Sequence, residues 1–281
     1  MDRPKFPETF DFDQAIDRRA VPSEKWDRYA GRDVIPMWVA DMDFAAPPAV
    51  LEALGRRLAH GVFGYTDPWP ELYRTVAEAL ARDHGWAVEP EWITFLPGVV
   101  AGFNAACLLA GQPGDGELTP APVYPPLLGA PANTGRQLQR VDLVLHSGRW
   151  QWDWAALEAA ATPASRLLLL CNPHNPVGRV FTREELARLA AFAEDRDLLI
   201  CSDEIHCGLV LDTDKPHLPI ASLGPEVARR TLTLMAPSKT WNIPALYCAF
   251  AVISDPALRS RYRRALRGLV PHVNVLGLVA A

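Results

Sequence analysis

One lysine in this sequence stands where a side chain could do covalent chemistry. Residues 231–235 read TLTLM, and Lys239 follows in the segment APSKTWNI at 236–243. Lysine is seldom fully buried without a partner. An amine that is held in a site with a lowered pKa is a nucleophile that forms Schiff bases with carbonyl compounds. Lys239 is therefore either a surface residue whose amine reaches water or the reactive group of an active site.

Other polar residues follow apolar runs in the same manner. Asn175 comes shortly after the run that ends at Cys171. Asp203 and His206 follow the run that ends at Ser202. In an open α/β sheet, ligands bind beyond the carboxyl ends of the strands. If these runs are strands of one parallel sheet, the amide, the acid and the lysine converge on one edge of it.

A helix start is expected at the same edge. Pro97 and Gly98 separate the run WITFL (92–96) from a helix predicted to begin at Val99. The free N–H groups at the start of a helix bind phosphate well. A lysine for a Schiff base, a carboxylate that keeps a pyridine nitrogen protonated, an amide for a phenolic oxygen and an anion site together suit pyridoxal phosphate. The predicted chemistry is that of a pyridoxal-phosphate site, with Lys239 as its reactive lysine.

Each of these residues also has an ordinary explanation. Asn, Pro and Gly dominate turns, so NPHNPVG (172–178) taken alone can be a turn. An acid after a strand, such as Asp203, is commonly part of a solvated loop, and a single lysine is commonly on the surface. Tyr124 in PVYPP can pack against its neighbouring prolines. The order of these residues and their repeated placement at the ends of apolar runs favour the active site.

The segments between these residues alternate between continuous apolar runs and helical patterns. Such runs are typical of strands that are buried on both faces. One helix is marked by a capping box of Thr182 and Glu185. Others are predicted at 47–61, 70–85 and 99–110. The alternation predicts an α/β fold in which a mostly parallel sheet is sandwiched by helices.

Composition excludes several classes of protein. With 281 residues, of which 49% are hydrophobic, the chain can bury a large core in one domain or in a large domain with a smaller one attached. A net charge of −5 without a basic block argues against nucleic acid as a partner. No stretch approaches the roughly 18 apolar residues of a membrane helix, so no membrane partner is expected. The polar, acidic N-terminus is unlike a signal peptide.

The cysteines indicate the compartment. All five lie outside C-x-x-C spacings, and most are inside apolar runs. An odd number in such settings predicts reduced, packed thiols in a cytoplasmic protein. Neither a disulfide framework nor a metal site is expected.

The motifs that contain these residues resemble a known family. The chain resembles the pyridoxal-phosphate enzymes of the aspartate-aminotransferase fold (fold type I), class I/II, and within them the cystathionine β-lyase or cysteine-conjugate C–S lyase branch. The motifs appear in the family's order as KWDRY (25–29), PMWVADMDF (36–44), FGYTD (63–67), PGVVAGFNAA (97–106), PVYPP (122–126), CNPHNPVGRVFT (171–182), SDEIHCGLV (202–210) and APSKTWNIPAL (236–246).

The resemblance implies a role for each residue around the cofactor. Lys239 is the lysine that binds the cofactor covalently. The other cofactor-binding residues are Gly98, Val99, Val100 and Ser238 at the phosphate, Tyr124 stacked on the ring, Asn175 at the phenolic oxygen with His206 near the same edge, and Asp203 at the pyridine nitrogen.

Further implications concern the substrate and a second subunit. Tyr65 is expected to reach the phosphate of the neighbouring subunit's cofactor, which implies a homodimer with shared sites. Asp41 and Asn175 are candidates for binding a small amino-acid substrate. The resemblance also implies an N-terminal arm, or part of a small domain, at 1–45 and a cofactor-binding large domain at 46–281.

Two departures from the family pattern bear on these expectations. Many relatives have a phosphate-binding arginine eight residues after the lysine, where this chain has Tyr247. Relatives also continue beyond VPHVNVLGLVAA (270–281), in a segment that builds most of the small domain and supplies the arginine for the substrate carboxylate. We therefore expect a partial small domain and a weakened carboxylate clamp, because a bidentate arginine is not readily replaced.

The implied reaction is the cleavage of cystathionine or a related L-cysteine S-conjugate to a thiol, pyruvate and ammonia. Lys239 would take the Cα proton as general base. An aminotransferase would use the same residues but return that proton to the cofactor. A chain that binds the cofactor with little turnover is the remaining alternative.

Overall fold

The computed structural model describes residues 9–281 of the chain, and within this range seven strands form one sheet. A separate hairpin consists of β4 (Val144–His146) and β5 (Arg149–Gln151). The strands of the main sheet are β1 (Ile93–Leu96), β2 (Gly116–Ala121), β3 (Gln137–Asp142), β6 (Ser165–Cys171), β7 (Leu199–Asp203), β8 (Thr231–Met235) and β9 (Ala249–Val252).

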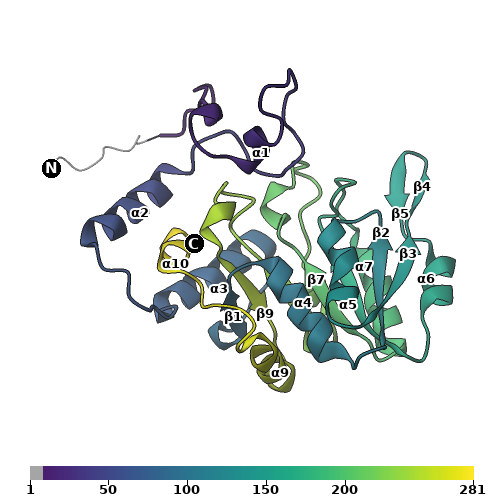
Figure 1. Ribbon diagram of the computed structural model, residues 1–281. Helices are drawn as coiled ribbons and strands as arrows, with labels where there is room; N and C mark the ends of the chain where they lie inside the picture. Colours follow the sequence, from purple (N-terminus) through teal and green to yellow (C-terminus); the bar gives the residue numbers. More distant parts are fainter. Residues whose placement is uncertain (1–8) are drawn as a thin grey trace.

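The order of the main sheet is β1-β9-β8-β7-β6-β2-β3 (Figure 1). Its pairs from β8 through β3 are parallel, whereas β9 is antiparallel to both of its neighbours. β1 and β8 therefore point the same way, and their carboxyl ends lie at the same edge as those of β7, β6 and β2. The predicted mostly parallel sheet is confirmed.

Helices cover both faces of this sheet (Figure 1). α4 (Val99–Ala110), α5 (Pro125–Asn133) and α9 (Pro256–Leu266) pack on one face, and their apolar side chains meet Leu167 and Leu169 of β6. The alternate residues of β6 meet the opposite layer. That layer contains α3 (Pro70–His84), α6 (Trp154–Ala160), α7 (Arg183–Asp195) and the short helix α8 (Pro225–Arg229).

Several helix ends match their sequence signals. The Thr182 hydroxyl accepts from the Glu185 N–H, and the Glu185 carboxylate accepts from the Thr182 N–H, so the predicted capping box of α7 is confirmed. Gly85 ends α3 with φ 61°, a left-handed conformation that glycine adopts without strain. The predicted ends of α4 at Val99 and Ala110 are also confirmed.

The N-terminal part of the chain lies apart from the sheet. It contains α1 (Glu24–Asp27) and α2 (Pro48–His60), and α2 packs against the C-terminal helix α10 (Val275–Ala280) (Figure 1). The predicted arm at 1–45 begins with eight residues that lie outside the described range, and its division from a large domain at 46–281 stays a prediction.

Two further expectations concern the thiols and the helices. All five cysteines are free, and four of them are buried, as the sequence predicted. Between residues 9 and 281, no helix has the length and apolar character needed to cross a membrane.

Candidate active site

A cavity of about 1090 Å³ lies beyond the carboxyl ends of the parallel strands. The loops that follow β1, β2, β6, β7 and β8 all contribute to its wall. Nearly all of the predicted cofactor residues line it, namely Gly98, Val99, Val100, Tyr124, Asn175, Asp203, His206, Ser238 and Lys239. The expected convergence of these residues at one edge of the sheet is therefore found.

Lys239 lies in a turn at 237–242 that begins shortly after β8 ends. Two backbone hydrogen bonds hold this turn, from Trp241 N to Pro237 O at 2.9 Å and from Ile243 N to Ser238 O at 3.0 Å. The Lys239 amine donates to the Ala40 carbonyl at 2.9 Å. Burial lowers the pKa of this amine, against the opposing effect of nearby carboxylates. Lys239 is thus a partly buried amine that a backbone carbonyl holds at the cavity wall.

Asp203 is the last residue of β7, and only 2% of its surface is exposed. Its carboxylate accepts one hydrogen bond, from the Ile205 N–H at 3.2 Å. Within residues 9–281 no lysine or arginine forms an ion pair with it. Burial raises the pKa of the carboxyl to about 7, while the Ile205 N–H and Lys239 act in the opposite direction. A buried acid of this kind favours a cationic partner, which would restore its usual ionisation.

The start of α4 forms an anion site on the same wall. Gly98 precedes the helix with an extended backbone, and no side chain caps the first turn. Val99 and Val100 also line the cavity, so the first N–H groups of the helix are available to a ligand there. Ser238, which is buried, adds a hydroxyl to the cavity wall. The helix dipole makes this position favourable for a phosphate group.

Three further side chains line the same cavity as the acid and the lysine. Tyr124 precedes α5, and burial raises the pKa of its phenol, with Asp203 adding to the effect. Burial lowers the pKa of His206, and the Lys239 charge lowers it further, so its imidazole is neutral at physiological pH. Asn175, the third residue of this group, lines the same cavity. The group can therefore offer an aromatic face, a neutral imidazole and an amide to a planar ligand.

Comparison with known proteins identifies the family. A family model described as aminotransferase class I and II matches residues 32–281. The chain belongs to this family. The cystathionine beta-lyase PatB of Bacillus subtilis (strain 168) is 40% identical over 261 residues, which are 91% of this chain and 67% of that protein. The aminotransferase family and its cystathionine β-lyase branch, both predicted from the motifs, are confirmed.

Solved structures of the family share the fold described above. The structure of OvoB is 46% identical in sequence and superposes with a TM-score of 0.94, covering 97% of this chain and 72% of that one. Cystalysin from Treponema denticola, whose structure contains a pyridoxal 5'-phosphate cofactor, is 33% identical with a TM-score of 0.92, covering 97% of this chain and 71% of that one. The chain thus spans about two thirds to three quarters of the length of these relatives.

Three residues that the family resemblance singled out are not buried cofactor-binding residues of this cavity. Tyr65 is fully exposed and is outside the cavity wall, and its role toward a neighbouring subunit stays a prediction. Asp41 does not line the cavity and instead pairs with Arg18 at 3.1 Å and with Lys25 at 3.7 Å. Tyr247, at the family's arginine position, lines the cavity but is more than half exposed.

Sequence reasoning missed part of the cavity wall. Trp38, Val39 and Ala40 line it, together with Glu24. Their contribution includes a backbone carbonyl that accepts from Lys239. The motif PMWVADMDF contains three of these residues, but no residue type in it indicates which backbone group faces the lysine. Family resemblance was the only available signal.

Proposed function

We propose that this protein is a pyridoxal-phosphate-dependent β-lyase of L-cysteine S-conjugates. With cystathionine, the reaction consumes one water and yields homocysteine, pyruvate and ammonia. The thiolate leaves with the electron pair of the Cβ–S bond. The observation that carries the proposal is the convergence of a buried acid, a partly buried lysine and an uncapped helix start on one cavity. The relative named cystathionine beta-lyase supports elimination over transamination.

The residues of the cavity fit the cofactor. The Asp203 carboxyl lacks a cationic partner among the described residues, and a protonated ring nitrogen would supply one. The N–H groups that open α4 suit a phosphate. Lys239 offers an amine for the aldehyde, and Tyr124 an aromatic face for the ring. The ring nitrogen, the phosphate, the aldehyde and the aromatic ring of the cofactor thus each have a chemically suitable group on the cavity wall.

The chain's own residues then divide the chemistry between them. When bound, pyridoxal 5'-phosphate supplies an electron sink for the pair left at the substrate Cα. Lys239 takes the Cα proton, since the lowered pKa of its amine keeps more of it neutral at physiological pH. Asp203 holds a proton at the ring nitrogen by charge pairing in a buried site. The neutral His206 beside Lys239 adds no competing positive charge.

We infer further that the protein is a cytoplasmic homodimer. A run of exposed side chains, Val62, Phe63 and Tyr65, projects from the segment after α2. Contiguous exposed apolar residues commonly mark protein interfaces, and a second copy is the partner that the shared-site role of Tyr65 requires. The five free thiols support a reducing compartment.

The proposal is tested by product analysis without a keto-acid acceptor. The purified chain is loaded with pyridoxal phosphate and given cystathionine, and free thiol and pyruvate are measured together. Equal amounts of both are expected, and both should vanish in Lys239→Ala. A requirement for an acceptor such as 2-oxoglutarate would assign the protein to the aminotransferases. A lysine-dependent absorption band without any product would leave cofactor binding as its only activity.

A further inference from the structure

The carbonyl that holds the lysine belongs to a segment that has no regular secondary structure. This segment, residues 38–44, forms part of the cavity wall through Trp38, Val39 and Ala40. The Ala40 carbonyl accepts a hydrogen bond from the Lys239 amine at 2.9 Å. The position of that amine therefore depends on how the 38–44 segment is held in place.

Asn242 holds the segment from the side of the lysine. Its Oδ1 accepts from the Met42 N–H at 2.9 Å. Its Nδ2 donates to the Met42 carbonyl at 3.0 Å and to the Phe44 carbonyl at 2.8 Å. Asn242 stands three residues after Lys239 in the same turn. The same turn thus contains the reactive amine of Lys239 and the amide of Asn242, which binds the segment that supports this amine.

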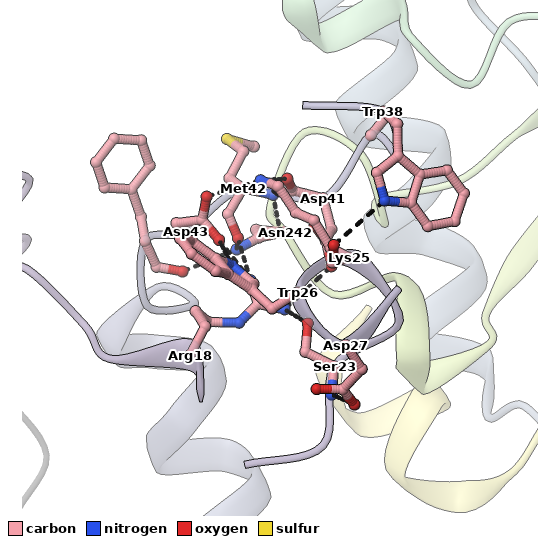
Figure 2. Close-up of polar contacts among 12 residues, drawn as sticks. Arg18, Ser23, Lys25, Trp26, Asp27, Trp38, Asp41, Met42, Asp43 and Asn242 are labelled. Carbon is pink, nitrogen blue, oxygen red and sulfur yellow. Dashed lines mark hydrogen bonds and ion pairs between the residues drawn. The ribbon is translucent and has the colours of Figure 1, made fainter. Parts of the chain in front are cut away.

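Two cations of the N-terminal arm, Arg18 and Lys25, also bind the segment (Figure 2). Lys25, only 6% exposed, donates to Asp43 at 2.7 Å and to the Asp41 carbonyl at 3.0 Å. Arg18 donates to Asp41 at 3.1 Å, to Asp43 at 3.0 Å and to the Met42 carbonyl at 2.9 Å. These charged hydrogen bonds are the stronger kind, and several are partly buried. The arm can therefore stay bound to the segment when Asn242 is altered, whereas the side-chain bonds of Asn242 are what tie the segment to the turn of Lys239.

We propose that Asn242 is a positioning residue for Lys239, fixing the 38–44 segment so that the Ala40 carbonyl holds the lysine amine whenever that amine is free. The inference rests on the proposed function, in which free Lys239 transfers a proton at the substrate Cα. A free amine on a flexible four-carbon stem has many rotamers, and an acceptor on the cavity wall restricts it to the few that face the cavity. Asn242 acts through this acceptor and does not line the cavity itself.

The backbone at Asn242 supplies a matched pair of substitutions. Its φ is 54°, in the left-handed region that asparagine, aspartate and glycine tolerate. Asn242→Gly therefore keeps the backbone and removes all three side-chain bonds. Asn242→Asp keeps the shape but turns both donated bonds into contacts between a carboxylate and carbonyl oxygens. An effect that both variants share comes from the amide and not from the turn.

Lysine accessibility provides a readout that needs neither cofactor nor substrate. The sequence contains only four lysines, at positions 5, 25, 215 and 239, so each can be followed in its own peptide. The full chain, with cofactor removed, is labelled with trinitrobenzenesulfonate across the pH range in which lysine titrates, and modification is quantified by mass spectrometry. Lys25 reports on the arm, and exposed Lys215 corrects for reagent.

Both Asn242 variants are expected to label Lys239 several-fold faster than the wild type, with Lys25 unchanged. Asn133→Asp makes the same chemical change at an exposed helix end and should change neither lysine. Unaltered Lys239 labelling in both variants would overturn the inference. An equal rise at Lys25 and Lys239 would also overturn it, because the amide would then support the arm in general and not the lysine.

The loaded protein gives a second readout. If the lyase reaction is observed, both variants should lower kcat by several-fold with KM for cystathionine little changed, since the amide affects the proton-transfer group and not the substrate contacts. If no lyase reaction is observed, the proposed function fails while the labelling result still decides the role of Asn242. The two failures are therefore distinguishable.

Discussion

Lys239 Nζ and the Ala40 carbonyl oxygen lie 2.9 Å apart although the two residues are separated by 199 positions in the chain. The contact joins an irregular segment before the sheet to a turn after one of its central strands. The reactive lysine is consequently supported by two parts of the molecule, its own turn and the 38–44 segment. Changes in either part should be detectable at the amine.

Removing the amine should remove both the cofactor's attachment and the base. We expect Lys239→Ala to lack the visible absorption band of the loaded protein and to lower the rate of pyruvate formation by at least about 10²–10⁴-fold, the usual contribution of a general base. Absorption spectra and a coupled pyruvate assay measure the two effects. Lys215→Ala is the control, because this lysine is exposed and forms its ion pair with Asp212, which does not line the cavity. Retained activity in Lys239→Ala would remove the basis of the proposed mechanism.

The buried acid makes stability depend on pH. The pKa of the Asp203 carboxyl is raised to about 7 by burial, so the unfolded chain ionises first as the pH rises. Its stabilising contribution is therefore fully present below about pH 4 and is lost as the pH rises through about 7, with a magnitude on the order of 4 kcal/mol. Asp203→Asn should flatten this loss in urea unfolding of the cofactor-free chain at about pH 5 and about pH 8. An unchanged slope would contradict the assignment.

A second buried acid, Glu117, serves as a control that distinguishes an effect on stability from an effect on cofactor binding. Burial also raises the pKa of Glu117 to about 7, against the opposing effects of Cys107 and Arg136. Glu117 does not line the cavity. Glu117→Gln should flatten the pH dependence of stability as Asp203→Asn does, but only Asp203→Asn should weaken pyridoxal phosphate binding in a fluorescence titration. Equal cofactor affinity in the two variants would argue against Asp203 as the partner of the ring nitrogen.

The anion site at the start of α4 can be tested by deleting one backbone donor. Proline fits the first position of a helix and lacks only the N–H, and the extended Gly98 backbone is compatible with a following proline. Val99→Pro should weaken pyridoxal phosphate binding by about 10-fold or more, as the loss of one charge-assisted hydrogen bond predicts. Val99→Ala keeps the N–H and serves as the control in the same titration. Similar affinities for the two variants would place the phosphate elsewhere.

Shared sites predict recovery of activity in mixed dimers. Lys239→Ala and Tyr65→Ala should each be inactive or weak alone. After the two variants are unfolded and refolded together, half of the dimers carry one intact site, which gives about a quarter of wild-type activity. Size-exclusion chromatography with light scattering establishes the dimer independently. A dimer without any recovery would mean that Tyr65 serves its own subunit or none.

Much of the site was predictable because strand ends are visible in sequence. The strands β6, β7 and β8 are rich in apolar residues and almost entirely buried, and the polar groups that line the cavity stand at their ends or shortly after them. β2 was not predicted, although all of its residues are buried, because Glu117 and Pro120 interrupt its pattern. The burial of a glutamate in a strand depends on tertiary contacts, and the local pattern of apolar and polar residues does not indicate it.

The support of the lysine could not be predicted from residue types. The Ala40 carbonyl is a backbone group, and every residue has one. Asn242 resembles any asparagine in a turn until its three bonds across 200 positions are known. The role of Asp41 at the substrate stays a prediction, and its ion pairs with Arg18 and Lys25 of the N-terminal arm were not predicted. The contacts of Ala40, Asn242 and Asp41 all join segments that are distant in the sequence, so residue type alone does not indicate them.

The sheet order also sets the sequence in which the molecule can be assembled during synthesis. β1 leaves the ribosome before β2, yet in the described sheet it pairs only with β9, the strand of that sheet that comes latest in the sequence. The parallel strands β2, β3, β6 and β7 can pair as they emerge, whereas β1 has no strand partner until residues 249–252 exist. Residues 93–96 therefore stay without a strand partner from their own synthesis until residues 249–252 have been made, and their backbone donors and acceptors are open to other contacts during that interval.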